Sequence, residues 1–167
     1  MPVHPTDGVT AIRDATRDDL PEIVALIREL AEYERDPAAA VATESLLDDA
    51  LFGAERVAHA VMAECDGTVA GFALWFHNFS TWTGRRGLYL EDLFVRPAFR
   101  GRGIGLSLLR HLARVALERG CPRMEWSVLN WNTDAIGFYE RLGARAMDDW
   151  TTYRMTPDAI RALAEER

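Results

Sequence analysis

The first half of the chain opens with two apolar patterns of helical period. Apolar residues at every third or fourth position predict an amphipathic helix over 18–35. Thr16, three residues before Asp19, forms a capping-box pair that marks the start of this helix. Thr43 is the predicted cap of a second, shorter helix, which ends near Gly53.

The pattern then changes to that of β-strands. Residues 57–65 and 68–76 are largely apolar and are joined by Asp66-Gly67, the dipeptide favoured in two-residue hairpin turns. These two runs are therefore predicted to form a β-hairpin. Residues 77–87, which are polar, aromatic and glycine-bearing, are predicted to form a loop.

A strongly apolar strand is predicted over 88–95, interrupted by the adjacent acids Glu91 and Asp92. Side chains of adjacent strand residues point to opposite faces, so at most one of these two carboxylates is expected to face a given pocket. A helix follows over 103–119. The remaining predicted elements are strands at 9–13, 123–129, 144–148 and 150–155, a helix that Asn132 caps and that ends near Arg141, and a short helix that opens at Thr156-Pro157.

The element order, βααβββαβαββα, predicts the α/β class: a mixed, mostly antiparallel central sheet flanked by helices. We expect an N-terminal extension over 1–10 and a single domain over 11–167. With 49% apolar and 27% charged residues, the composition argues against disorder. The apolar runs are too short to cross a membrane, and residues 1–9 lack the apolar core of a signal peptide, so a cytoplasmic location is expected.

The charge and cysteine content narrow the possible partners. A net charge of −7 disfavours nucleic acid and anionic membranes, both of which bind basic surfaces, and suits a cationic ligand. Cys65 and Cys121 have neither metal-site spacing nor the density of a disulfide scaffold, so they are predicted to be small buried residues. No metal site is expected.

The segment most informative about chemistry is the glycine-rich run between the 88–95 strand and the following helix. Gly101, Gly103 and Gly105 let the backbone curl and present successive N–H groups, and a helix N-terminus adds its positive dipole end. Such a turn suits a pyrophosphate group. The spacing matches neither a P-loop nor a dinucleotide-binding fingerprint.

The pattern Arg100-x-x-Gly103-x-Gly105 resembles the acetyl-coenzyme A signature of the GNAT acetyltransferase superfamily. Other segments match in order and spacing, and together they are similar to the spermidine/spermine (diamine) N-acetyltransferase branch: 30–34, 88–95, Trp131-Asn132 and Phe138-Tyr139. The resemblance implies transfer of an acetyl group from acetyl-CoA to a small cationic amine. It also implies a homodimer.

The resemblance implies two sets of site residues. The cofactor set lies along the apolar strand, the glycine-rich turn and the helix after Asn132: Leu93, Phe94, Val95, Arg100, Gly101, Arg102, Gly103, Ile104, Gly105, Leu106, Asn132, Thr133, Asp134, Ala135 and Tyr139. Within it, the Leu93 amide would polarise the thioester carbonyl. The substrate set, to which an exposed Trp82 could add a stacking surface for a cation, is Tyr33, Glu34, Glu91, Asp92, Trp82, Glu125, Trp126 and Ser127.

Two of these residues have expected catalytic roles. A primary amine has a pKa near ~10.4 and must lose a proton before it attacks, and Glu91 is the candidate base. Tyr139 is the candidate acid for the leaving thiolate. Neither cysteine falls in a motif segment, so direct attack without an acyl-enzyme is predicted.

Three alternative functions remain open at this stage. Thialysine acetyltransferases belong to the same branch, and Arg85 or Arg86 could pair with the carboxylate of such a substrate. Acetylation of a protein would require an open, long groove. A non-catalytic acyl-CoA-binding module could dispense with Glu91 and Tyr139, yet both are present.

Overall fold

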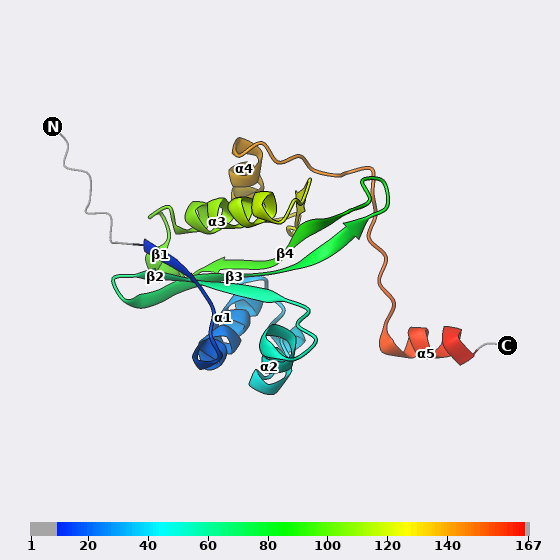
Figure 1. Ribbon diagram of the computed structural model, residues 1–167. Coiled ribbons are helices and arrows are strands. Elements are labelled where there is room, and N and C mark those ends of the chain that lie inside the picture. The colour runs from blue at the N-terminus through cyan, green and yellow to red at the C-terminus, as the bar shows by residue number, and fades with distance from the viewer. Residues whose placement is uncertain (1–9, 166–167) are drawn as a thin grey trace. The chain divides into compact units, whose positions relative to one another are not determined.

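The computed structural model describes residues 10–165, which fall into two compact units divided after Ser127. The predicted N-terminal extension lies outside the described residues apart from Thr10. In the first unit the strands form one five-stranded sheet in the order β1-β2-β3-β4-β5 (Figure 1). The strands are β1 (Thr10–Asp14), β2 (His59–Cys65), β3 (Thr68–Ser80), β4 (Arg85–Val95) and β5 (Met124–Glu125). All neighbours are antiparallel except β4 and β5, which confirms the predicted fold class.

Helices cover both faces of this sheet (Figure 1). Helices α1 (Leu20–Tyr33) and α2 (Glu44–Phe52) lie on one face, and α3 (Ile104–Glu118) lies on the other. Short 3-10 turns precede or follow them at 17–19, 37–39 and 97–99. The core beneath α1 and α2 is built from the apolar stripes that predicted these helices, packed on alternate residues of the strands, among them Met62, Phe72 and Phe94.

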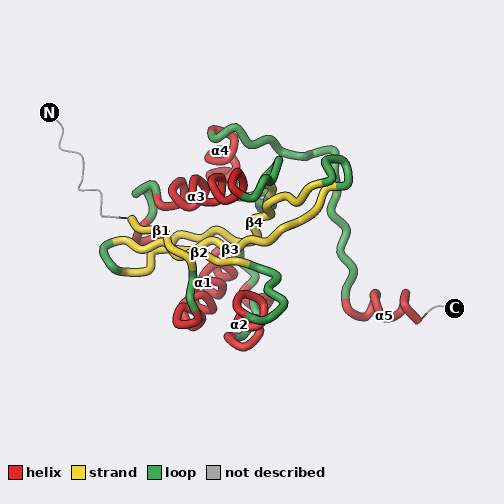
Figure 2. The backbone as a smooth tube through the Cα atoms, in the orientation of Figure 1, coloured by secondary structure: helices red, strands yellow, loops and turns green. Residues whose placement is uncertain are grey.

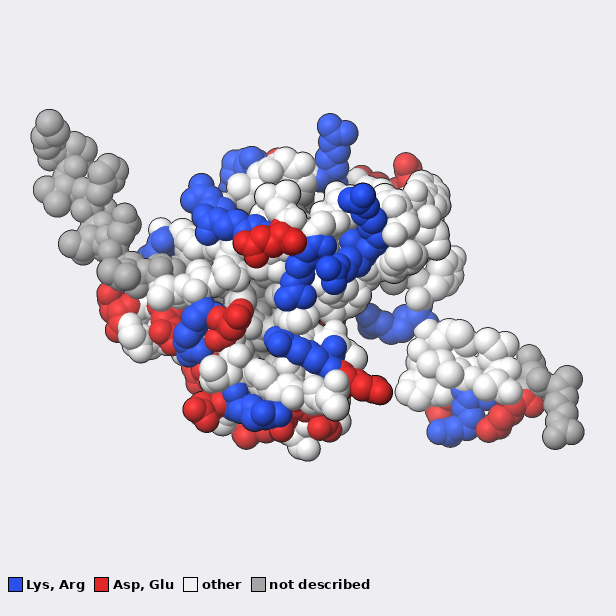
Figure 3. All heavy atoms as spheres, viewed as in Figure 1, with Lys and Arg blue, Asp and Glu red and all other residues white. Residues whose placement is uncertain are grey.

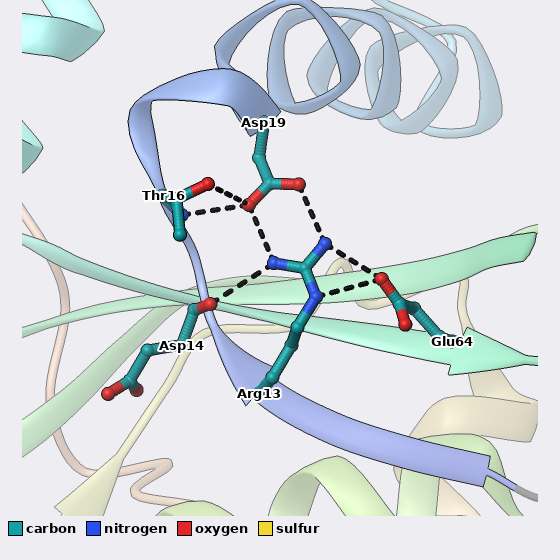
Figure 4. Close-up of polar contacts among 5 residues, drawn as sticks. All are labelled: Arg13, Asp14, Thr16, Asp19 and Glu64. Atoms are coloured by element: carbon teal, nitrogen blue, oxygen red, sulfur yellow. Dashed lines mark hydrogen bonds and ion pairs between the residues drawn. The ribbon is translucent and has the colours of Figure 1, made fainter. Parts of the chain in front are cut away.

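The corner between β1 and α1 is held by a polar cluster, drawn in Figure 4. The Arg13 guanidinium donates to both Asp19 carboxylate oxygens, at 2.7 and 2.8 Å, and to Glu64 of β2 at 2.8 Å. Asp19 also accepts from the Thr16 backbone N–H at 2.8 Å, as the predicted capping box requires. The cluster therefore ties the start of α1 to two strands.

The predicted loop over 77–87 is wrong. β3 continues to Ser80 and β4 begins at Arg85, so the two strands form a long hairpin whose turn is only residues 81–84 (Figure 2). Cross-strand pairing explains the difference, because Phe76 stacks against Tyr89 with ring centroids 5.1 Å apart. The polar and glycine residues of this segment suggested a loop, whereas cross-strand contacts of this kind hold it in a hairpin.

The second unit contains α4 (Thr133–Arg141) and α5 (Pro157–Glu165). Asn132 caps α4 through the Ala135 N–H, as predicted. The strands predicted at 144–148 and 150–155 are wrong, since this part of the described chain contains no strand. The strand predicted at 123–129 is reduced to β5. A strand requires a neighbour to pair its backbone groups, and an apolar sequence cannot supply one.

Figure 3 shows both positive and negative side chains on the viewed face of the first unit. Ion pairs in this unit include Arg17–Asp48 and Arg96–Glu29, each at 2.7 Å. Cys65 and Cys121 are free and buried, which confirms the prediction for both. None of the helices within 10–165 has the length and apolar character needed to cross a membrane.

Candidate active site

The centre of β4 carries a β-bulge. Leu74 of β3 is paired with Asp92, whereas the next residue, Trp75, is paired with Leu90, so Glu91 is the extra residue on β4. A bulge interrupts the alternation of side chains along a strand. Simple alternation therefore does not by itself decide which way Glu91 and Asp92 point.

The bulge leaves the two carboxylates in different environments. Glu91 is exposed, whereas Asp92 is partly buried and is paired with Leu74, a residue of the core beneath α1 and α2. Burial, followed by the nearby charges of Glu91 and Glu34, raises the pKa of Asp92 to about 6. No hydrogen bond or ion pair is formed by Asp92 within the described residues. Asp92 is thus a carboxyl group that could accept a proton near neutral pH.

The edge of β4 beyond this bulge is open toward β5. The parallel pairing of β4 with β5 involves only Leu88 with Met124 and Tyr89 with Glu125. The backbone over 90–95 consequently has no strand partner on that side within the described chain. Unpaired strand N–H and C=O groups can bind another extended chain of amides, which is the chemistry of a pantetheine arm.

The glycine-rich turn lies between β4 and α3 and has the predicted open geometry. Gly101 and Gly103 both have φ of +76°, a left-handed conformation that disfavours residues with a Cβ atom. A Cβ atom at either glycine would have no neighbour within 4 Å, so the space over the turn is free. Gly103 is the N-cap residue of α3, and the first backbone N–H groups of a helix have no hydrogen-bond acceptor within the helix itself. The chain's own residues therefore fit a pyrophosphate group at this position.

Arg100 lies beside two aromatic rings, a contact that the sequence did not indicate. Its Nε donates to the Val95 carbonyl oxygen at 2.9 Å. Its guanidinium carbon lies 4.8 Å from the Tyr33 ring centroid and 5.6 Å from that of Phe94. The side chain thus reaches from the glycine-rich turn to the end of α1. Its two terminal nitrogens form no hydrogen bond to any described residue.

The structure unites some of the predicted substrate residues and separates others. Tyr33 lies 6.4 Å from Phe94, ring centroid to ring centroid, and partial burial raises the pKa of the neighbouring Glu34. Near β5, Glu125 accepts from Asn78 at 3.0 Å. Trp82, in contrast, lies in the hairpin turn and is 87% exposed, ten residues along the chain from Asp92.

Two further groups near β5 were missed by the sequence analysis. The Tyr89 hydroxyl lies 2.9 Å from Ser127 Oγ, and Asn78 contacts Glu125. Their signal was weak, because Asn78 fell in the supposed loop and Tyr89 appeared as one apolar strand residue among several. Trp126 lies between Glu125 and Ser127, immediately after β5. The predicted site residues Asn132, Thr133, Asp134, Ala135 and Tyr139 all belong to the second unit, at or on α4.

The chain is similar to known acetyltransferases in sequence and has the fold of a solved protein. The profile of the Acetyltransferase (GNAT) family matches residues 20–144. Thialysine N-epsilon-acetyltransferase of Sus scrofa is 38% identical over 165 residues, covering 92% of this chain and 96% of the relative. Spermidine/spermine N(1)-acetyltransferase-like protein 1 of Homo sapiens is 32% identical over 167 residues, covering 93% of this chain and 24% of the relative. An integron cassette protein from the mobile metagenome of V. cholerae has a similar structure, with TM-score 0.78 and 28% identity over 94% of this chain and 98% of that one.

Proposed function

The chain belongs to the GNAT acetyltransferase family, and within its acetyl-CoA-dependent N-acetyltransferase activity we propose that it acetylates the side-chain amine of a small lysine-like amino acid. The observation that carries this proposal is the β4 bulge, which places the partly buried Asp92 beside an unpaired strand edge. The thialysine acetyltransferases to which the chain is similar over nearly its whole length support the acceptor class.

In this proposal Asp92 accepts the proton of the incoming ammonium. Its pKa of about 6 leaves it ionised at neutral pH yet basic enough to take part in proton transfer. The sequence pattern favoured Glu91 for this role. Glu91 stays a candidate, because the two carboxylates interact and could share the proton through water.

Acetyl-CoA supplies an activated thioester carbonyl. The residues proposed to hold it are the glycine-rich turn for the pyrophosphate and the backbone over 93–95 for the pantetheine arm, with the Leu93 N–H donating to the carbonyl oxygen. Residues 132–135 would add contacts at the start of α4. The Tyr139 hydroxyl would hold the proton that the departing sulfur receives.

A diamine or polyamine is the second candidate acceptor. Asp92 interacts electrostatically with both Glu91 and Glu34, and such a group of carboxylates suits an acceptor with more than one ammonium. The similarity to a spermidine/spermine N(1)-acetyltransferase-like protein supports the same class.

One experiment tests the proposed function directly. Thiol release from acetyl-CoA should be measured with thialysine, lysine, ornithine, putrescine, spermidine, tyramine and a short peptide. We expect the amino acids with side-chain amines to give the highest kcat/KM. A Tyr139→Phe variant is the control for enzymatic transfer and should lose roughly 10²-fold in kcat. Activity with the peptide alone would contradict the proposal.

We also propose that the protein is a homodimer, as the family resemblance implies. Apolar and aromatic side chains of the second unit, including Met147, Trp150 and Tyr153, are more than 60% exposed, which is unusual for a free surface. Light scattering coupled to gel filtration should give a mass near twice 18.8 kDa.

A further inference from the structure

Arg100 lies beside Phe94 of β4 and has no acidic partner among the described residues. The chain has 19 cationic side chains and all are arginine. Arg96 is bound by Glu22 and Glu29, and Arg13 is bound by Asp19 and Glu64. Arg100 instead donates its Nε–H to a backbone carbonyl, and its guanidinium carbon lies over two aromatic rings. Both terminal nitrogens are thereby left available for an external anion.

Phe94 lies between Asp92 and Arg100 in this set of contacts, and the dimensions along β4 are comparable with the length of a lysine-like molecule. Asp92 and Phe94 are two positions apart on β4, roughly 7 Å along the strand. The Arg100 guanidinium carbon lies 5.6 Å from the Phe94 ring. An extended lysine spans roughly 7 Å from its carboxylate carbon to its side-chain nitrogen. The nearby Glu34, adjacent to Tyr33, provides a negative charge for a second ammonium.

Arg85 and Arg86 are the sequence-based candidates for binding a substrate carboxylate. Both lie too far from Asp92 along β4 to bind the same small acceptor. Arg85 and Arg86 begin β4, and Arg86 and Asp92 are six positions apart, which corresponds to about 20 Å. Arg86 Nε donates to the carbonyl of Arg119 at the end of α3. This separation is more than twice the length of a lysine-like acceptor.

From these placements we propose that Arg100 binds the α-carboxylate of the acceptor, while Glu34 binds its α-ammonium. The inference rests on the proposed function and makes it specific to α-amino acids. Arg100 would then determine acceptor specificity, whereas its place in the cofactor signature predicts a contact with pyrophosphate. A planar guanidinium fixed by stacking can bind a carboxylate through two parallel hydrogen bonds.

Three acceptors that share one reacting amine test the proposal with the full-length protein: lysine, cadaverine, which lacks the carboxylate, and 6-aminohexanoate, which lacks the α-amine. We expect wild-type kcat/KM for lysine to exceed that for cadaverine by about 10-fold or more, the scale of one charge-assisted interaction. Arg100→Gln should reduce the lysine-to-cadaverine ratio about 10-fold. Glu34→Gln should reduce the lysine-to-6-aminohexanoate ratio instead.

Arg110→Gln, the same substitution at an exposed position of α3, is the matched control and should leave both ratios unchanged. Arg100→Lys keeps the charge but loses the planar fork, so it should give an intermediate ratio. A wild-type preference for cadaverine overturns the proposal. An Arg100→Gln variant with unchanged ratios and a raised KM for acetyl-CoA also overturns it, in favour of the pyrophosphate contact. Absence of wild-type activity on all three acceptors would instead count against the proposed function itself.

Discussion

Two aspartates of the same unit illustrate how their partners decide what a carboxylate does. Asp19, at the β1–α1 corner, is 8% exposed and is surrounded by donors from Arg13 and Thr16 (Figure 4). These hydrogen bonds, opposed by burial, lower its pKa to about 2. Asp92, at the β4 bulge, has burial and two neighbouring carboxylates instead, and its pKa is raised to about 6. The first aspartate stabilises the fold, and the second is suited to exchange a proton.

The largest expected effect comes from neutralising Asp92. Asp92→Asn keeps the shape of the side chain and removes the proton acceptor, so kcat/KM should fall about 10²-fold or more. In the wild type, kcat/KM should rise as the pH passes about 6, the pKa of Asp92, and this step should vanish in the variant. Steady-state kinetics across pH 5–8 measures both. A greater loss in Glu91→Gln than in Asp92→Asn would assign the base to Glu91.

Neutralising Asp19 should have the reverse profile. Asp19→Asn removes a bidentate acceptor and leaves Arg13 poorly paired, which should lower the free energy of unfolding by about 1–3 kcal/mol. Thermal and urea unfolding measure this change. The kcat/KM of the folded fraction should stay at the wild-type value. A kinetic defect without loss of stability would show that the two regions are not functionally separate.

The pH dependence of stability should have opposite signs at the two aspartates. The stability contributed by Asp19 is present above pH 4 and should be lost as the pH falls through about 2, because its pKa is lowered in the folded state. Ionising Asp92 should cost stability as the pH rises from about 4 through 6, because its folded pKa is raised. Urea unfolding of the wild type and both Asn variants at several pH values compares these slopes. Parallel slopes would refute the assigned environments.

The smallest expected effect involves a third partly buried group, on the α3 side of the sheet. His59 stacks on Trp75 at 4.2 Å, and burial together with the charges of Arg56 and Arg119 lowers its pKa to about 4. Its contribution to stability is present above pH 6.5 and should decline as the pH falls toward 4. His59→Phe keeps an aromatic stack without titrating, so its melting temperature should fall less between pH 7 and 5. An identical fall in both proteins would contradict this interpretation.

The sequence by itself determined the elements whose signals are local. Helical periodicity predicted the helices, and the caps at Thr43 and Asn132 marked where two of them begin. The Asp66-Gly67 turn predicted a hairpin. These signals sufficed because each acts over only a few neighbouring residues. The glycine-rich turn was equally readable, since Gly101 and Gly103 adopt conformations that few other residues tolerate. The family resemblance then indicated the cofactor and the class of reaction.

Only the tertiary structure decided the properties that depend on pairing between distant segments. The bulge exists because β3 and β4 pair with one extra residue at Glu91, and no property of β4 alone indicates which of its two acids becomes buried. The contact of Arg100 with Tyr33 joins residues 67 positions apart. The strands predicted after residue 143 failed for the same physical reason: β-structure and buried charge are properties of the neighbours that a segment acquires, and a local pattern does not contain them.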